Sequence, residues 1–410
     1  MEEWNIIKAY DYCYNVTDGT HDSPKQTEFG KYLITSKHIK DNRIDFESAY
    51  KISEDDYNKI ITRSKVDQWD IIISMIGAYC GFCCIESSKQ TDYAIKNVGL
   101  LKVGNELKCK WLYYYLTSPH GKQQLSKLRS GSSQPYISLG ALRNLDIPVP
   151  NENTMSDIVS VLSSLDSKIE LNRCINDNLE QQAQALFKSW FVDFEPFKDG
   201  KFVESEIGMI PEGWKVGKLE DIADVVGGGT PSKANALYFD KQCIPWITPK
   251  DLSIKKTKFI SKGEIDITEE GYKNSSAKKI PLGSVLFSSR APIGYISIAE
   301  NELTTNQGFK SVVPVKAGTS FLYLYLKANT KAIEAQATGS TFKEASGSLM
   351  KSLCVIIPPD TVFDSFERNA FPFFSAQANV EREIVNLSKA RDTLLPRLMS
   401  GELKINDLNC

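Results

Sequence analysis

Histidine is scarce in this chain of 410 residues: only His21, His38 and His120 occur, and no two of them form an H-x-x-x-H pair. A hydrolytic triad or a histidine-based zinc site therefore lacks its usual side chains. The sequence also has no G-x-x-x-x-G-K-[ST] for nucleotide phosphates, no G-x-S-x-G, and no Asp/Asn-Pro-Pro-aromatic string to hold an extruded adenine. We therefore predict no catalytic residue, no metal and no cofactor.

Long apolar runs are missing too. No stretch approaches the roughly 20 apolar residues of a membrane-spanning helix, and the start, MEEWNIIKAYDY, is acidic, unlike a signal peptide. The nine cysteines are scattered, and the C-x-x-C of Cys80 and Cys83 has no second ligand pair. We expect a cytoplasmic location with reduced thiols, and interpret Cys80, Cys83 and Cys84 as small buried residues of a strand.

A strong net charge is absent, since 49 Lys and Arg oppose 51 Asp and Glu. The distribution is nevertheless uneven. Residues 1–150 carry 19 basic against 18 acidic side chains and residues 196–359 carry 21 against 17, whereas residues 151–195 carry 3 against 8. Slightly basic segments permit contacts with phosphate groups but do not require them.

What the sequence does contain is a long helical pattern over residues 156–194. Alternating steps of four and three keep side chains on one stripe of an α-helix and are typical of a coiled coil. Polar Asn172 and Asn176 lie on this stripe, where they weaken packing but fix register. The full stripe is Ile158, Leu162, Leu165, Ile169, Asn172, Asn176, Leu179, Ala183, Leu186 and Trp190.

A second stripe with the same steps lies near the other end of the chain. It consists of Phe373, Gln377, Val380, Ile384, Leu387, Arg391, Leu394 and Leu398. Shifted by 208 positions, it matches the first stripe from Leu165 to Trp190, with Val380 and Ile384 in place of the two asparagines. The matched spacing predicts that the two helices pair; two amphipathic helices buried in separate cores are the alternative.

The rest of the chain is a weak internal repeat of residues 1–150 in residues 211–359. The copies match in order, at offsets of 208 to 213. The matches include Gly19-Thr20 with Gly229-Thr230, Asn97-Val98-Gly99 with Asn306-Gln307-Gly308, Trp111–Leu116 with Phe321–Leu326, and Gly131-Ser132-Ser133 with Gly339-Ser340-Thr341. In this alignment Gly77 occupies the position of Arg290.

These patterns predict an α+β protein with two similar domains of mixed α/β structure and two long helices that form an antiparallel coiled coil, with a pseudo-twofold internal repeat. Short β-branched or apolar runs bounded by Gly or Pro indicate strands, and aromatic and Leu residues at helical spacing indicate helices. We expect the first domain over residues 1–150, the central helix over 151–195, the second domain over 196–359, and the distal helix with a tail over 360–410.

The loops of both copies are suited to binding rather than catalysis. Hydroxyls and lysines on Gly-containing turns favour phosphate contacts, and a guanidinium held just after a strand is suited to the O6/N7 edge of guanine. Each loop taken singly could be an ordinary surface turn. The candidate phosphate contacts are Thr20, Lys37, Thr230, Lys233 and Lys250; the candidate base contacts are Arg290, Lys343, Gln134, Tyr136 and His38; and Ser289 and Thr341 complete the candidate DNA-binding set.

The chain as a whole resembles the specificity subunits of type I restriction–modification systems. The resemblance rests on the two domains alternating with two long helices, on the string from Leu179 to Phe194, on the string from Ser388 to Leu403, and on Gly229-Thr230-Pro231-Ser232 and Asn306-Gln307-Gly308. The first domain departs from this pattern, with His21-Asp22 in place of Pro-Ser and Lys96-Asn97-Val98 in place of Thr-Asn-Gln.

The resemblance implies a non-catalytic subunit in which each domain reads half of a split site in double-stranded DNA and the helical pair sets the spacer between the halves. It also implies two methylation subunits and restriction subunits as partners. Three alternatives remain: the recognition subunit of another multi-subunit methylation or restriction system, a coiled-coil adaptor that does not touch DNA, and a self-contained adenine methyltransferase.

Overall fold

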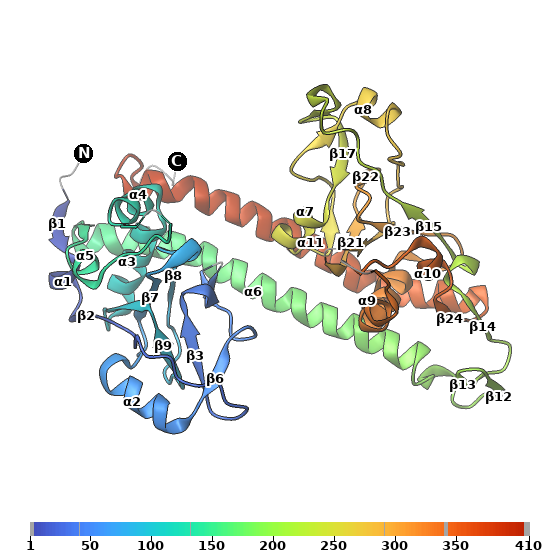
Figure 1. Ribbon diagram of the computed structural model, residues 1–410, viewed down its shortest axis with the longest axis horizontal. Helices are drawn as coiled ribbons and strands as arrows, with labels where there is room; N and C mark the ends of the chain where they lie inside the picture. Colours follow the sequence, from blue (N-terminus) through green and yellow to red (C-terminus); the bar gives the residue numbers. More distant parts are fainter. Residues whose placement is uncertain (1–3, 41, 132, 291, 340–342, 406–410) are drawn as a thin grey trace. The chain divides into compact units, whose positions relative to one another are not determined.

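A computed structural model describes residues 4–40, 42–131, 133–290, 292–339 and 343–405. The chain divides into two compact units: unit 1 comprises Met1–Ile169 and Asn386–Cys410, and unit 2 comprises Glu170–Val385. Each unit contains part of both long helices, α6 (Glu152–Phe191) and α11 (Asp360–Met399) (Figure 1).

Unit 1 combines small sheets with short helices. Its main sheet has the order β2-β10-β7-β8, with antiparallel neighbours, and a second sheet has the order β6-β3-β9. The strands are β1 (Asn5–Lys8), β2 (Asn15–Asp18), β3 (Lys31–Thr35), β4 (Ile39–Lys40), β5 (Arg43–Ile44), β6 (Tyr50–Ile52), β7 (Asp70–Ser74), β8 (Cys83–Ile85), β9 (Tyr93–Lys96), β10 (Val98–Lys102) and β11 (Asp146–Val149). The helices are α1 (Ala9–Tyr12), η1 (Ser36–His38), α2 (Glu54–Ser64), η2 (Gly77–Tyr79), α3 (Glu106–Thr117), α4 (Pro119–Lys127) and α5 (Leu139–Arg143).

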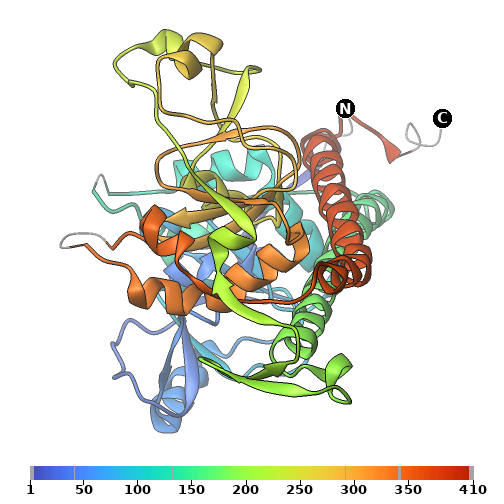
Figure 2. The ribbon, with the colours of Figure 1, turned by 90° about the vertical axis from the view of Figure 1, so that its right-hand side faces the viewer.

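Unit 2 is built in the same way around a sheet of order β15-β23-β20-β21-β18, on which α9 packs (Figure 2). Its strands are β12 (Phe202–Ser205), β13 (Gly208–Pro211), β14 (Lys215–Lys218), β15 (Ala223–Gly227), β16 (Phe239–Asp240), β17 (Ile244–Ile247), β18 (Phe259–Ile260), β19 (Asp266–Ile267), β20 (Val285–Ser289), β21 (Ile293–Ala299), β22 (Thr304–Thr305), β23 (Lys310–Pro314) and β24 (Cys354–Ile357). Its helices are η3 (Glu195–Phe197), η4 (Leu219–Asp221), η5 (Ala236–Tyr238), α7 (Pro249–Lys255), α8 (Glu269–Lys273), α9 (Thr319–Gln336) and α10 (Gly347–Lys351).

The two units share one topology, which confirms the predicted pair of similar α+β domains. The antiparallel pair β1-β11 of unit 1 corresponds to β14-β24 of unit 2. The order β2-β10-β7-β8 corresponds to β15-β23-β20-β21, and the helices over the two aromatic repeats are α3 and α9. The repeat in the sequence is therefore a repeat of structure.

Both long helices contribute to the core of each unit. In unit 1, Ile158 and Leu162 of α6 are buried with Leu395 and Leu398 of α11. In unit 2, Phe191 of α6 lies 4.8 Å from the ring of Phe321 and 4.9 Å from that of Phe366 on α11, measured between ring centroids. The start of α6 thus packs against the end of α11, and the end of α6 packs against the start of α11. The pairing is therefore antiparallel, as predicted.

The ends of the long helices differ from those expected. Helix α6 begins four residues before Ser156 because the Asn151 side chain accepts a hydrogen bond of 2.9 Å from the N–H of Thr154 and caps it. Helix α11 begins at Asp360 and continues through Pro372 and Pro396. Proline removes a backbone donor, but the buried apolar residues on both sides of Pro372 hold the helix in place.

Candidate functional site

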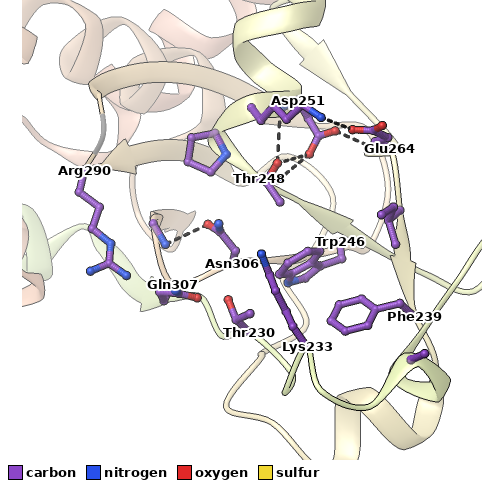
Figure 3. Close-up of a pocket in the computed structure, with 15 residues that line it drawn as sticks. Thr230, Lys233, Phe239, Trp246, Thr248, Asp251, Glu264, Arg290, Asn306 and Gln307 are labelled. Atoms are coloured by element: carbon purple, nitrogen blue, oxygen red, sulfur yellow. Dashed lines mark hydrogen bonds and ion pairs between the residues drawn. The ribbon is translucent and has the colours of Figure 1, made fainter.

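A cavity of about 740 Å³ lies within unit 2 and gathers four of the candidate contact residues (Figure 3). Those four residues are separated by up to 60 positions in the sequence: Thr230 and Lys233 lie on one loop, Lys250 is in the first turn of α7, and Arg290 follows β20. The lining residues are Thr230, Lys233, Ala236, Phe239, Trp246, Thr248, Pro249, Lys250, Asp251, Glu264, Ile265, Arg290, Asn306, Gln307 and Gly308. Apolar walls with a few converging polar groups are typical of a binding site.

Close backbone packing places Thr230 at this cavity. A Cβ on Gly228 would lie 2.0 Å from the carbonyl oxygen of Asn306, and a Cβ on Gly229 would lie 2.2 Å from the backbone nitrogen of Ala277, so only glycine fits at either position. The indole N–H of Trp246 donates a hydrogen bond of 3.0 Å to the carbonyl of Gly229. The hydroxyl of Thr230 is buried and has no hydrogen-bond partner in the described part of the chain.

The turn at Asn306 connects this loop to the strand that precedes Arg290. The side-chain oxygen of Asn306 accepts a hydrogen bond of 2.9 Å from the N–H of Gly308. The carbonyl of Gly308 in turn accepts hydrogen bonds from the N–H (2.7 Å) and the hydroxyl (3.1 Å) of Ser289. Arg290 therefore follows a strand whose last residue, Ser289, is fixed by two hydrogen bonds to one carbonyl.

The two lysines of the cavity are in different situations. Lys233 is exposed, as is Lys250, but the ammonium of Lys250 lies 2.8 Å from the carboxylate of Glu264. The hydrogen bond with Glu264 holds the pKa of Lys250 above its ordinary value. Glu264 is anchored by its N–H, which donates to the side chain of Asp251, the residue that completes the capping box of α7 with Thr248. Lys250 thus has a nearby carboxylate with which any phosphate would compete.

Arg290 also has an acidic neighbour, Glu344, which the sequence reasoning missed. The guanidinium lies 3.4 Å from one carboxylate oxygen of Glu344, and the ammonium of Lys310 lies 3.0 Å from the other. No periodicity or motif marks Glu344. It follows the loop at Gly339, of which Thr341, a candidate contact, lies outside the described residues, whereas Lys343 is exposed.

In unit 1, His21, which departs from the family pattern, contacts Asn97, which lies between the divergent residues Lys96 and Val98. A ring nitrogen of His21 lies 2.9 Å from the side-chain oxygen of Asn97, and its other nitrogen lies 3.1 Å from Asp18, which also pairs with Arg63. Thr20, half-buried, precedes this group. The two divergent strings of the first copy are thus linked by the contact between His21 and Asn97.

His38 and Ser289 do not fit the roles expected for them. His38 is fully buried, and its Nδ1 accepts a hydrogen bond of 3.0 Å from the N–H of Thr35. Burial lowers the pKa of His38, so the neutral ring is favoured. Ser289 is also fully buried and satisfied by Gly308. The prediction that these two side chains contact DNA is contradicted by their burial, whereas the neighbouring Lys37 is exposed.

Gln134 and Tyr136 lie on an exposed loop of unit 1. Backbone hydrogen bonds correct the alignment of this region. The N–H of Ile137 donates to the carbonyl of Met75, as that of Ala345 donates to Ser289. These matching bonds pair Ile76, rather than Gly77, with Arg290, and Tyr136 with Glu344.

The described residues contain no group of three or more His, Cys, Asp or Glu side chains that could hold a metal ion. Cys80, Cys83 and Cys84 are buried, as predicted, and burial raises the pKa of the Cys83 thiol to about 12. Among the described helices, none has both the length and the apolar character needed to cross a bilayer.

Comparison with known proteins gives consistent matches. Residues 1–181 and 211–362 match the model of the type I restriction modification DNA specificity domain. The chain is 45% identical over 162 residues to the type I restriction enzyme MjaIX specificity subunit of Methanocaldococcus jannaschii, covering 38% of this chain and 37% of that protein. It is 28% identical over 342 residues to the HindI specificity subunit of Haemophilus influenzae, covering 68% of this chain and 74% of that protein.

The fold is also found in a solved structure. The type I restriction-modification S subunit from M. genitalium aligns over 96% of both chains with a TM-score of 0.58 and 15% sequence identity. At this identity the likeness concerns the fold.

Proposed function

Because the chain belongs to the type I restriction–modification DNA specificity family, we propose that it is the sequence-specific DNA-binding subunit of such a complex and recognises a bipartite site. The observation that carries this proposal is the cavity of unit 2, which brings together Thr230 and Lys233 from one loop, Lys250 from α7, and Arg290 from the end of β20. Chemistry is left to other subunits, and the chain needs no cofactor of its own.

Within this cavity the proposed roles follow from exposure and anchoring. Lys233, on a loop, and Lys250, in α7, are exposed and hold backbone phosphates, which set the register of the protein on the duplex. Arg290 follows a strand fixed by the Gly308 carbonyl, so its guanidinium is held in place to read a base edge. Thr230 contributes a buried hydroxyl without a partner in the described part of the chain.

Unit 1 reads the other half of the site through a different set of side chains. Thr20 and the exposed Lys37 are its proposed phosphate contacts, and the exposed Gln134 and Tyr136 its proposed base contacts. In unit 2, Lys343 is a further proposed base contact. Since Ile76 and Tyr136 replace Arg290 and Glu344, the two units should prefer different bases.

The long helices have the proposed role of setting the unread spacer and docking two methylation subunits and the restriction subunits. The domain boundaries at residues 150, 195 and 359 belong to this proposal, as does a cytoplasmic location, where the host DNA lies. The alternative from another class, a coiled-coil adaptor that never touches DNA, is not favoured by the match to the DNA specificity family.

Selection from a random duplex library tests the DNA proposal. We expect the full chain, with its methylation subunits, to enrich two short blocks separated by an unselected spacer, with affinity that falls steeply as salt is added. An adaptor would enrich no sequence and show no such salt dependence.

A heptad insertion tests the role of the helices. Seven residues added to both α6 and α11 lengthen each by about 10 Å, or roughly three base pairs of DNA. The boundary between the units falls at Ile169 in α6 and Val385 in α11, so insertions there leave the contacts within each unit unchanged. We expect both blocks to stay the same while the preferred spacer changes; altered blocks would contradict the proposed role.

A further inference from the structure

Three charged side chains of unit 2 form a cluster beside the cavity: Arg290, Lys310 and Glu344. The two carboxylate oxygens of Glu344 lie 3.4 Å from the Arg290 guanidinium and 3.0 Å from the Lys310 ammonium. Lys310 is the most buried of the three, with a side chain 15% exposed, against 38% for Arg290 and 34% for Glu344. One carboxylate thus serves two cations.

The backbone fixes this cluster. The N–H of Glu344 donates a hydrogen bond of 2.9 Å to the carbonyl of Thr338, and the N–H of Ala345 donates one of 2.9 Å to the carbonyl of Ser289. Lys310 begins β23, which is the neighbour of β20 in the sheet. Main-chain hydrogen bonds therefore hold the backbones of Glu344 and Arg290 next to each other. Their ion pair does not depend only on the conformations that the two side chains adopt.

We propose that Glu344 is a specificity-determining residue that denies phosphate groups access to Arg290 and leaves its remaining N–H donors for a base edge. This inference rests on the DNA-binding function proposed above. A guanidinium has five N–H donors, and a single contact with Glu344 leaves a pair free for the two acceptors of guanine.

The reason lies in charge. A phosphate that approached Arg290 or Lys310 would come close to the Glu344 carboxylate, and two negative charges at such a distance repel each other. The edge of a base carries no net charge, so the carboxylate opposes it far less. Glu344 therefore weakens binding to arbitrary DNA more than binding to the correct site. The ratio of specific to nonspecific affinity rises as a result.

The test compares Glu344→Gln with wild type in the full chain together with its methylation subunits. Glutamine keeps the shape of the side chain but removes the charge. The matched control is Glu206→Gln on the exposed turn between β12 and β13, which changes the net charge by the same amount. Affinity is measured for the duplex selected by the wild type and for a scrambled duplex, across a series of salt concentrations.

We expect Glu344→Gln to bind scrambled DNA about fivefold or more tightly, with a salt slope steeper by about one, and to bind the selected duplex with little change. Glu344→Asp retains the charge and should keep most of the discrimination. Glu206→Gln should behave as the wild type does.

Two results would overturn the inference. If Glu344→Gln loses affinity for the selected duplex alone, the carboxylate itself contacts a base; if both affinities stay the same or fall together, its role is purely structural. A wild-type chain that enriches no motif would instead remove the proposed function, and this inference with it.

Discussion

Asp166 on α6 and Arg391 on α11 form an ion pair of 2.8 Å across 225 positions of sequence. The other carboxylate oxygen of Asp166 accepts a hydrogen bond of 2.8 Å from the hydroxyl of Tyr114 on α3. The pair therefore links the two long helices to the globular part of unit 1. Arg391 occupies a position in the second stripe where a coiled coil usually carries an apolar residue.

A double-mutant cycle should detect this link. With side chains 22% and 31% exposed, Arg391 and Asp166 are partly shielded from solvent, and we expect a coupling energy of about 1 kcal/mol between Arg391→Gln and Asp166→Asn. Urea unfolding of the two single variants and the double variant gives this value. The more exposed pair of Lys198 and Glu195, with side chains 59% and 53% exposed, serves as the control and should show no measurable coupling.

Lys258 is the corresponding charged link in unit 2. Its ammonium lies 2.9 Å from Glu180 on α6, 2.7 Å from the Gln377 side-chain oxygen on α11, and 3.3 Å from the ring centroid of Phe374. Removing the carboxylate would leave a buried cation with a weaker set of partners. We therefore expect Glu180→Gln to destabilise unit 2 by about 3–5 kcal/mol at neutral pH.

The pH dependence of this loss follows from the pKa of Glu180. Burial alone would raise it, but Lys258 and Lys327 together outweigh burial and lower the pKa from 4.5 to about 2. The stabilisation is therefore complete above about pH 4.5 and is lost as the pH falls toward 2. Denaturant unfolding at several pH values should show the deficit of Glu180→Gln shrinking over this interval, while Asp177→Asn, an exposed change on α6, should show little deficit at any pH.

Arg290→Ala tests base reading in unit 2. If the guanidinium contacts a guanine, its removal should cost about 1–3 kcal/mol for the preferred duplex and relax a single position of one block. Selection from the random library with the variant shows which position changes. Equal weakening on every sequence would make Arg290 a phosphate contact instead.

Lys233→Gln should behave in the opposite way. Because Lys233 is exposed and is proposed to contact a phosphate, its removal should weaken binding to all duplexes alike and lower the salt slope by about one. Lys201→Gln, an exposed lysine just before β12, is the matched control and should leave the slope unchanged. A change of sequence preference in Lys233→Gln would contradict the assigned role.

Periodicity was enough to predict the long helices and their pairing. Every position of both predicted stripes is buried or half-buried in the structure, including Asn172, which is 1% exposed. The order of the repeat is likewise visible in short matched strings, because each string marks a strand end, a turn or, in the aromatic repeats, a helix that both units need.

The sequence was a poorer guide to side chains that act through neighbours distant in the chain. Glu344 and Lys258 carry no local pattern, and their importance depends on Arg290, Glu180 and Gln377, which only folding brings near. His38 was misjudged because a polar residue in a loop-like stretch can turn inward to accept a backbone hydrogen bond. Such outcomes depend on packing, which single-sequence patterns do not encode.

We propose that each of the two similar domains reads one half of a divided DNA site. The decisive experiment is to sequence the methylated bases of host DNA with and without this gene. We expect one methylated motif, made of two specific blocks around a spacer of fixed length, that disappears when the gene is removed. Methylation that persists unchanged without the gene, or a lost motif that forms one continuous block, would contradict it.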